Sequence, residues 1–174
     1  MSCVALIPAF CPGPALSALV EALKSEDFQG IVVIDDGSGP EFQAVFEKLS
    51  QIDGIYVLRH AINLGKGAAL KAGINYILCR WPGVEGVVTA DADGQHAPED
   101  ILRVAHRFLE SPGSLVLGAA VLDESAPARS RVGNALTRSV LRVVLGQTIR
   151  DTQTGLRAIP AVLLPSLLAI PASG

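Results

Sequence analysis

Residues 85–110 read EGVVTADADGQHAPEDILRVAHRFLE, and this stretch contains the repeating unit of the fold. The apolar run at its start is typical of a short buried strand, and we predict a strand over 85–91. Apolar residues then recur at the three- and four-residue spacing of a helix face, at Leu102, Ala105, Phe108 and Leu109. Pro98 followed by two acidic residues is typical of a first helical turn. The stretch therefore predicts a strand, a polar connection and a helix over 98–110.

The same alternation continues along the chain. Further strands are predicted at 3–8, 30–35, 54–59 and 114–119, and further helices at 15–25, 41–50, 65–80 and 129–146. Alternating strands and helices indicate an α/β fold with a mainly parallel sheet sandwiched by helices. The length of 174 residues, without internal repeats or linkers, predicts a single domain over residues 1–174.

Composition narrows the class of protein. The net charge is −3 and no basic run occurs, so nucleic-acid binding has no electrostatic support. Three widely spaced cysteines form no metal-binding pattern and favour a reducing, cytoplasmic setting. No stretch of about 18 apolar residues is present, and the N-terminus is predicted to be a strand rather than a signal peptide. The apolar tail at 158–174 is either a short helix packed on the core or a membrane-surface contact.

Polar or backbone-shaping residues follow four consecutive predicted strands. Ligands of open α/β sheets bind at the carboxyl ends of the strands, so this pattern predicts a ligand crevice. The segments are Pro8-Ala9-Phe10, Asp35-Asp36-Gly37-Ser38, Arg59-His60 with Asn63-Leu64-Gly65-Lys66-Gly67, and Asp91-Ala92-Asp93.

Asp91 and Asp93 suggest what the crevice binds. Side chains alternate along a strand, so the two carboxylates are expected on one side. Carboxylate oxygens suit Mg²⁺ or Mn²⁺, and two are too few to enclose such an ion without water and phosphate. The pair therefore predicts a metal-bridged diphosphate, with a solvated turn as the alternative. The P-loop pattern G-x-x-x-x-G-K-[ST] is absent because Ala68 follows Gly67. No G-x-G-x-x-G follows the first strand, which disfavours a dinucleotide-binding fold.

Six segments together carry a resemblance to a known family. They are LIPAF (6–10), VVIDDGSG (32–39), HAINLGKGAALKAG (60–73), TADADGQHAPEDI (89–101), SRVGNALTR (130–138) and DTQTGLRAIP (151–160). With these segments the chain resembles the family-2 glycosyltransferases of the GT-A fold, close to the polyprenyl-phosphate (dolichol-phosphate type) hexosyltransferases. The resemblance covers nearly the whole chain and implies an enzyme that binds a nucleotide sugar.

The resemblance also implies roles for individual residues. It places Pro8, Phe10, Ile34 and Asp36 around the nucleotide base and ribose, Lys66 near the nucleotide, Asp91, Ala92 and Asp93 at the metal and diphosphate, Gln95 at the reacting sugar or acceptor, Arg131 at the acceptor phosphate, and Asp151 and Arg157 on a loop that closes the site.

Several of these residues have simpler interpretations. Asp35 and His60 are expected to orient loops, and His106 to lie on the surface. The alternative to a loop-closing role is that Arg157 is a surface charge and that Asp151 is a helix-end or turn residue. His96 is either a metal ligand or a structural histidine. These alternatives are open at the level of sequence.

The chain departs from the family pattern at three places. Pro12 replaces an acidic residue after the first strand, which leaves base recognition open. Ala119 and Ala120 stand where relatives often carry an arginine, which weakens the phosphate-acceptor assignment. The chain ends at Gly174, before the acceptor-site structure usual in relatives, so we expect a C-terminal truncation.

The resemblance implies an inverting, metal-dependent hexosyltransferase that uses Mg²⁺ or Mn²⁺. The expected donor is a UDP- or GDP-hexose, and the expected acceptor is a polyprenyl phosphate at the cytoplasmic face of the membrane. Such a phosphate needs no general base, whereas a hydroxyl acceptor would make Asp151 the candidate base. The alternatives are a sugar-1-phosphate nucleotidyltransferase and a non-catalytic sugar-nucleotide-binding module.

Overall fold

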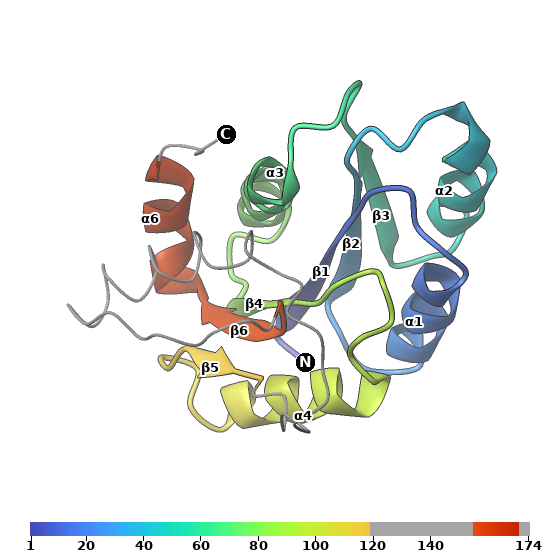
Figure 1. Ribbon diagram of the computed structural model, residues 1–174. Coiled ribbons are helices and arrows are strands. Elements are labelled where there is room, and N and C mark those ends of the chain that lie inside the picture. Colours follow the sequence, from blue (N-terminus) through green and yellow to red (C-terminus); the bar gives the residue numbers. More distant parts are fainter. Residues whose placement is uncertain (119–154, 171–174) are drawn as a thin grey trace, which may run out of the picture.

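A computed structural model describes residues 1–118 and 155–170 (Figure 1). Strands and helices alternate through the first part, as the sequence predicts. The elements are β1 (Cys3–Ala9), α1 (Ala15–Lys24), β2 (Gly30–Asp35), the 3-10 helix η1 (Pro40–Phe42), α2 (Gln43–Ser50), β3 (Ile55–Arg59), α3 (Lys66–Arg80), β4 (Gly86–Thr89), α4 (Pro98–Leu109), β5 (Val116–Leu117), β6 (Arg157–Pro160), the 3-10 helix η2 (Ala161–Leu163) and α6 (Leu164–Ala169).

The described strands form one six-stranded sheet in the order β3-β2-β1-β4-β6-β5. Strands β1 to β4 are parallel, whereas β6 lies antiparallel between β4 and β5. The predicted, mainly parallel sheet is therefore confirmed. The carboxyl ends of the four parallel strands meet at one edge, with the order of connections reversing beside β1.

Helices cover both faces of the sheet, as predicted (Figure 1). One face packs against α1, α2 and α4, and the other packs against α3 and α6. Successive strand residues therefore enter two different cores, which is why β1 and β2 are buried along their whole length. The first core includes Ile7, Val33, Leu16, Phe46 and Phe108, and the second includes Leu6, Ile34, Leu70, Ile74 and Leu164.

The structure corrects three sequence predictions about elements. Strand β4 ends at Thr89, so Asp91 and Asp93 lie beyond the strand, in a turn, and strand alternation does not govern their direction. Strand β6 was not predicted, and the expected strand at 114–119 is shortened to Val116–Leu117. The helix predicted at 129–146 falls outside the described residues.

The apolar tail forms the short packed helix that was one of its two interpretations. Leu164 and Leu167 of α6 are buried in the core that α3 shares. The Lys71 ammonium on α3 donates hydrogen bonds to the carbonyl oxygens of Leu168 and Ile170, at the end of α6. Among the helices of residues 1–118 and 155–170, none combines the length and hydropathy that a membrane crossing requires.

Candidate active site

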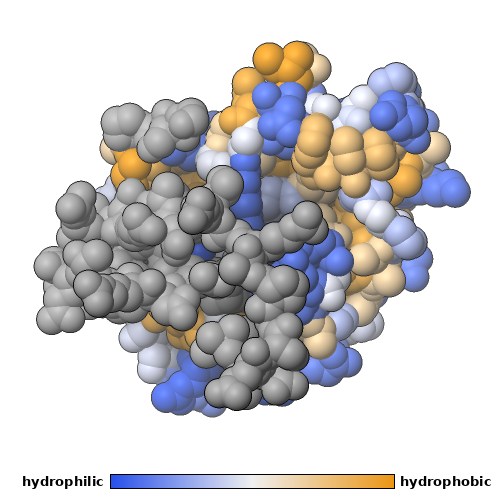
Figure 2. Space-filling view, viewed as in Figure 1, coloured by the Kyte–Doolittle hydropathy of each residue, from blue (hydrophilic) through white to orange (hydrophobic). Residues whose placement is uncertain are grey.

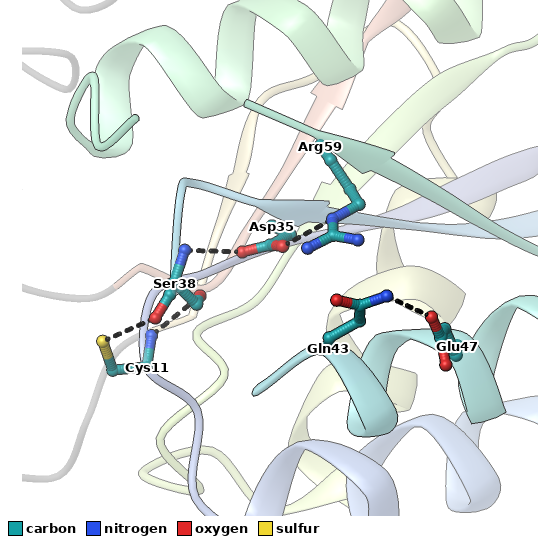
Figure 3. A network of polar contacts seen from close by, with 6 residues as sticks. All are labelled: Cys11, Asp35, Ser38, Gln43, Glu47 and Arg59. Atoms are coloured by element: carbon teal, nitrogen blue, oxygen red, sulfur yellow. Dashed lines mark hydrogen bonds and ion pairs between the residues drawn. The ribbon is translucent and has the colours of Figure 1, made fainter. Parts of the chain in front are cut away.

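Asp35, at the end of β2, organises one side of the crevice edge (Figure 3). Its carboxylate accepts hydrogen bonds from the Ser38 backbone N–H at 2.9 Å and from Arg59 Nε at 3.0 Å. Ser38 Oγ in turn accepts the Cys11 backbone N–H at 2.9 Å, which ties the end of β1 to the same turn. The predicted loop-orienting role of Asp35 is confirmed.

Asp36 holds the β3–α3 loop on the opposite side of that turn. The side chain of Asp36 is buried, and its oxygens accept the backbone N–H groups of Leu64 at 3.0 Å and Gly65 at 2.8 Å. His60 Nδ1 lies 2.7 Å from Oδ1 of the same carboxylate, which confirms that His60 pins a turn. Both carboxylate oxygens of Asp36 thus already have partners within the protein. The contact between Asp36 and ribose that the family resemblance implies stays a prediction.

The β3–α3 loop approaches the turn after β2 so closely that only glycine fits there. Gly37 has φ = +72°, and a Cβ at this position would lie 2.3 Å from the carbonyl carbon of Ile62. With its backbone fixed in this way, the loop turns the side chains of Ile62 and Leu64 outward, where they are exposed. Figure 2 shows a hydrophobic projection at the top of the view, where this loop lies in Figure 1.

The residues expected around the nucleotide differ in how much they present to a ligand. Pro8 and Ile34 pair in register across β1 and β2, and both are buried. Phe10 follows β1 and is 53% exposed, so its ring is available for stacking on a base. Among these three residues, Phe10 alone offers an open side-chain surface.

Asp91 lies at the centre of the candidate site and is held from several sides. Its Oδ1 pairs with the ammonium of Lys66, the first residue of α3. His96 Nε2 lies 3.9 Å from Oδ2, and this buried nitrogen has no hydrogen-bond partner among the described residues. The Gly155 backbone lies close to the carboxylate, because a Cβ added at Gly155 would lie 2.2 Å from Oδ2. The Gly155 carbonyl accepts the Thr89 hydroxyl at 2.8 Å, which fixes Gly155 beside β4.

Arg157 contributes a second positive charge near Asp91. It begins β6 and stands in register with Thr89 of β4. Arg157 is 5% exposed, so its interpretation as a surface charge is wrong. Burial lowers the pKa of Arg157 below its usual value, and the negative charge of Asp91 opposes that shift. The buried guanidinium is therefore electrostatically coupled to the Asp91 carboxylate.

Asp93 and Gln95 form a small exposed unit beside Asp91. The Asp93 carboxylate accepts the Gln95 backbone N–H at 3.0 Å and its side-chain Nε2 at 2.6 Å. Ala92, between the two aspartates, is half-buried and packs against the core. The turn thus anchors at Ala92 and leaves Asp93 and Gln95 facing solvent.

The donor chemistry of this turn fits a hard divalent cation. Asp91 and Asp93 supply carboxylate oxygens, and His96 Nε2 is an unpartnered nitrogen close to Asp91. The described residues contain no group of three or more His, Cys, Asp or Glu side chains placed to hold a metal by themselves. A cation at Asp91 and Asp93 would accordingly take its remaining ligands from water and from substrate phosphate.

Two of the predicted site residues cannot be placed relative to Asp91. Arg131 and Asp151 fall outside the described residues, so their predicted roles stay predictions.

A pocket of about 460 Å³ opens on the α2 side of the turn after β2, next to Arg59, Pro40 and Gln43. Its lining does not include Lys66 or Asp91. His106 is exposed, as expected.

Gly155 was missed at the level of sequence. Its only signal is its place in the segment DTQTGLR, because a close approach to Asp91 is visible only once β6 pairs with β4. The cationic role of Arg157 was left open for the same reason.

Comparison with known proteins identifies relatives along most of the chain. The family model described as glycosyl transferase family 2 matches residues 5–161. "Uncharacterized protein MJ1222" of Methanocaldococcus jannaschii is 32% identical over 88% of this chain and 62% of its own length. The UDP-N-acetylglucosamine–dolichyl-phosphate N-acetylglucosaminyltransferase of Methanococcus voltae is 27% identical over 88% of this chain and 67% of its own length. The polyprenol monophosphomannose synthase of Mycolicibacterium smegmatis is 31% identical over 74% and 49%. The chain thus spans about half to two thirds of these relatives.

Solved structures confirm the GT-A fold. Glucosyl-3-phosphoglycerate synthase from Mycobacterium tuberculosis, crystallised with Mn²⁺ and UDP, has a TM-score of 0.60 and 19% identity over 92% of this chain and 57% of its own. A 4-diphosphocytidyl-2C-methyl-D-erythritol synthase has a TM-score of 0.58 and 16% identity over 97% of this chain and 80% of its own. Because the names of these two proteins denote different reactions, the fold alone does not identify the chemistry.

Proposed function

We propose, from the premise that this chain belongs to glycosyl transferase family 2, that it transfers a hexose from a nucleotide-diphosphate sugar to a polyprenyl phosphate with inversion at the anomeric carbon. Membership of the family makes the protein a glycosyltransferase. The identity of the donor and acceptor, and the dependence on a metal, are parts of the proposal.

The observation that carries this proposal is the charge arrangement around Asp91. Lys66 and Arg157 bring two positive charges to one carboxylate, beside the exposed Asp93 and Gln95. Such a cluster at the carboxyl edge of a parallel sheet suits a diphosphate better than a neutral ligand. A divalent cation on Asp91 and Asp93, when bound, supplies charge neutralisation for the diphosphate leaving group.

The side chains then have distinct tasks in a single displacement. An oxygen of the acceptor phosphate forms a bond to the anomeric carbon, and the bond from that carbon to the donor diphosphate breaks with its electron pair. The nucleoside diphosphate leaves as an anion, which Lys66 and Arg157 offset. The acceptor phosphate is already anionic at neutral pH, so no residue has to remove a proton from it.

The acceptor class is supported by the relatives and by one surface feature. Two of the relatives described above are named as a dolichyl-phosphate N-acetylglucosaminyltransferase and a polyprenol monophosphomannose synthase. Ile62 and Leu64 are exposed aliphatic side chains on a loop that leads directly into Lys66. We propose that this loop touches the cytoplasmic membrane surface and brings the site to the lipid phosphate.

The test offers radiolabelled UDP-, GDP-, CDP- and dTDP-sugars to the full-length protein with Mn²⁺. Undecaprenyl phosphate and a soluble hydroxyl acceptor are supplied in parallel, and Asp93→Asn is the inactive control. We expect a labelled lipid product from one donor. Transfer only to the hydroxyl acceptor would defeat the phosphate-acceptor proposal and make Asp151 the candidate base. Pyrophosphate release from a nucleoside triphosphate and a sugar-1-phosphate would instead identify a nucleotidyltransferase, and donor binding without turnover a binding module.

Arg131→Ala tests the acceptor site, on the basis of the family resemblance. Losing one charged phosphate contact costs about 1.5–3 kcal/mol, or roughly ten- to hundredfold in affinity. We expect KM for undecaprenyl phosphate to rise by that factor while donor affinity, measured by calorimetry, stays unchanged. An equal loss of donor affinity would remove Arg131 from a specific acceptor role.

A further inference from the structure

Lys66 pairs with Asp91, the carboxylate that the proposed function assigns to a metal ion. Its ammonium pairs with Oδ1, and the two side chains are partly exposed, at 35% for Lys66 and 22% for Asp91. Lys66 follows Gly65, whose backbone N–H is held by the buried carboxylate of Asp36. The position of Lys66 is thus set by a fixed loop, whereas its side chain is a flexible stem that can move.

Further described residues also act on the Asp91 carboxylate. The Gly155 backbone lies against the carboxylate, and the positive charge of Arg157 acts on it from β6. His96 Nε2 lies 3.9 Å from Oδ2. A divalent ion that approaches Asp91 in the absence of substrate therefore meets the positive charges of Lys66 and Arg157, beside a carboxylate that Lys66 already pairs.

Lys66 is also poorly placed by its own helix. It opens the 15-residue helix α3, and the N-terminus of a helix carries a partial positive charge that disfavours a cation and favours an anion. Pairing with Asp91 offsets this repulsion in the free protein. A diphosphate arriving at the same helix end would attract the ammonium away from Asp91.

We propose that Lys66 is the resident counter-ion of Asp91, which a divalent cation displaces and which then pairs with the donor diphosphate. The proposal rests on the proposed function for the identity of the donor. It makes metal and nucleotide bind cooperatively, because each relieves the repulsion that the other meets. By thermodynamic linkage, the nucleotide must raise metal affinity by the same factor by which the metal raises nucleotide affinity.

The experiment measures Mn²⁺ binding directly, from the electron paramagnetic resonance signal of the free ion. Wild type, Lys66→Met and the control Lys48→Met are compared without nucleotide and then with saturating UDP or GDP. Lys48 is an exposed lysine near the end of α2, so its loss changes the net charge equally. Circular dichroism establishes that each variant is folded, and Asp91→Asn reports binding outside the site.

Lys66→Met should tighten Mn²⁺ binding to the nucleotide-free protein by about tenfold, while Lys48→Met stays within about twofold of wild type. In wild type the nucleotide should tighten Mn²⁺ binding by a factor within the usual range of about 5–150, and in Lys66→Met this factor should shrink. Nucleotide affinity should fall in Lys66→Met. A residue with a merely structural role would weaken both ligands together.

Several outcomes would overturn the proposal. They are unchanged or weaker Mn²⁺ binding in Lys66→Met, an equal gain in Lys48→Met, or Mn²⁺ binding to wild type that Asp91→Asn leaves intact. If Lys66→Met fails to fold, Lys66→Gln replaces it, with the same expected gain and the same overturning result. Absence of sugar transfer alongside this coupling would reject the proposed function and leave the counter-ion role standing, whereas transfer without coupling would do the reverse.

Discussion

At the scale of single residues, two neighbours determine the orientation and the charge balance of the Asp91 carboxylate. A flexible lysine pairs with one oxygen, and the backbone of Gly155, two residues before β6, borders the carboxylate. The Lys66 side chain can move away from Asp91. The Gly155 backbone cannot, because the Thr89 hydroxyl and the β4–β6 pairing hold it in place. Gly155 therefore restricts the direction of the carboxylate, and Lys66 balances its negative charge.

Gly155→Ala should misdirect Asp91. The new Cβ would lie 2.2–2.5 Å from the carboxylate atoms, so the side chain must move. We expect a loss of about 1–3 kcal/mol in the free energy of unfolding, typical of overpacking, and at least about a tenfold loss of kcat/KM. Urea denaturation and the transfer assay measure these two effects. Gly83→Ala is the control, since a Cβ there meets no atom within 4 Å. Wild-type activity in Gly155→Ala would show that the close approach of Gly155 to Asp91 is not needed for transfer.

Asp36→Ala should destabilise the protein as well as weaken nucleotide binding. It removes the acceptor of two backbone N–H groups and of His60 Nδ1, in a buried position. Leaving such donors without a partner costs about 1–3 kcal/mol of unfolding free energy. Thermal denaturation measures the loss, with the exposed Asp53→Ala as the control. An unchanged Tm with weaker nucleotide binding would return Asp36 to the simple ligand role that the family resemblance implies.

At the scale of secondary-structure elements, the second half of the site depends on short pieces held by long-range contacts. Strand β6 has four residues and α6 has six, so neither is stable from local propensity alone. Strand β6 pairs with β4 and β5, and α6 packs on α3. Anchoring of α6 therefore contributes to the placement of Arg157.

Lys71→Met should loosen α6. The ammonium binds two carbonyl oxygens at the end of that helix, where a positive charge also interacts favourably with the helix dipole. We expect about 1–2 kcal/mol less stability and faster amide hydrogen exchange over residues 164–170. Lys24→Met, on the exposed end of α1, provides the control. Equal exchange in both variants would show that apolar packing alone anchors α6.

The elements that sequence predicted well are those with a local signal. Buried parallel strands read as continuous apolar runs, as in GIVVID at 30–35, and β2 has those bounds. Strand β6 reads RAIP, with a charge at one end and a proline at the other, and only its partners make it a strand. The β4 boundary at Thr89 is set by pairing with β1 and β6, which no local pattern reveals.

At the scale of the whole molecule, ligand binding should stabilise the fold as a unit. A ligand at one hundred times its Kd adds about 2.7 kcal/mol to the stability of the state that binds it, or roughly 5–10 °C in Tm for a protein of this size. We expect this shift for one nucleoside diphosphate together with Mn²⁺, and a much smaller shift with a chelator. Equal shifts with and without the chelator would contradict a metal role at Asp91 and Asp93.

The gathering of site residues at one edge was predictable, because the carboxyl ends of parallel strands meet there. Contacts within the site were not predictable. Lys66 and Asp91 are 25 positions apart, and their pairing depends on how the β3–α3 loop folds over Asp36. The burial of Arg157 depends on β6, so its charge could equally have been placed on the surface.

The position of β6 in the sheet has a consequence for how the protein is made. Strand β4 ends at Thr89, and β6, its neighbour opposite β1 in the described sheet, ends at Pro160. A ribosome adding about 5–20 residues per second needs roughly 4–14 s to cover the 71 residues between these two ends. During that time the nascent chain holds β4 as an open sheet edge, and open edges recruit strands from other chains. Slower translation through this interval would prolong the exposure and favour aggregation over completion of the site.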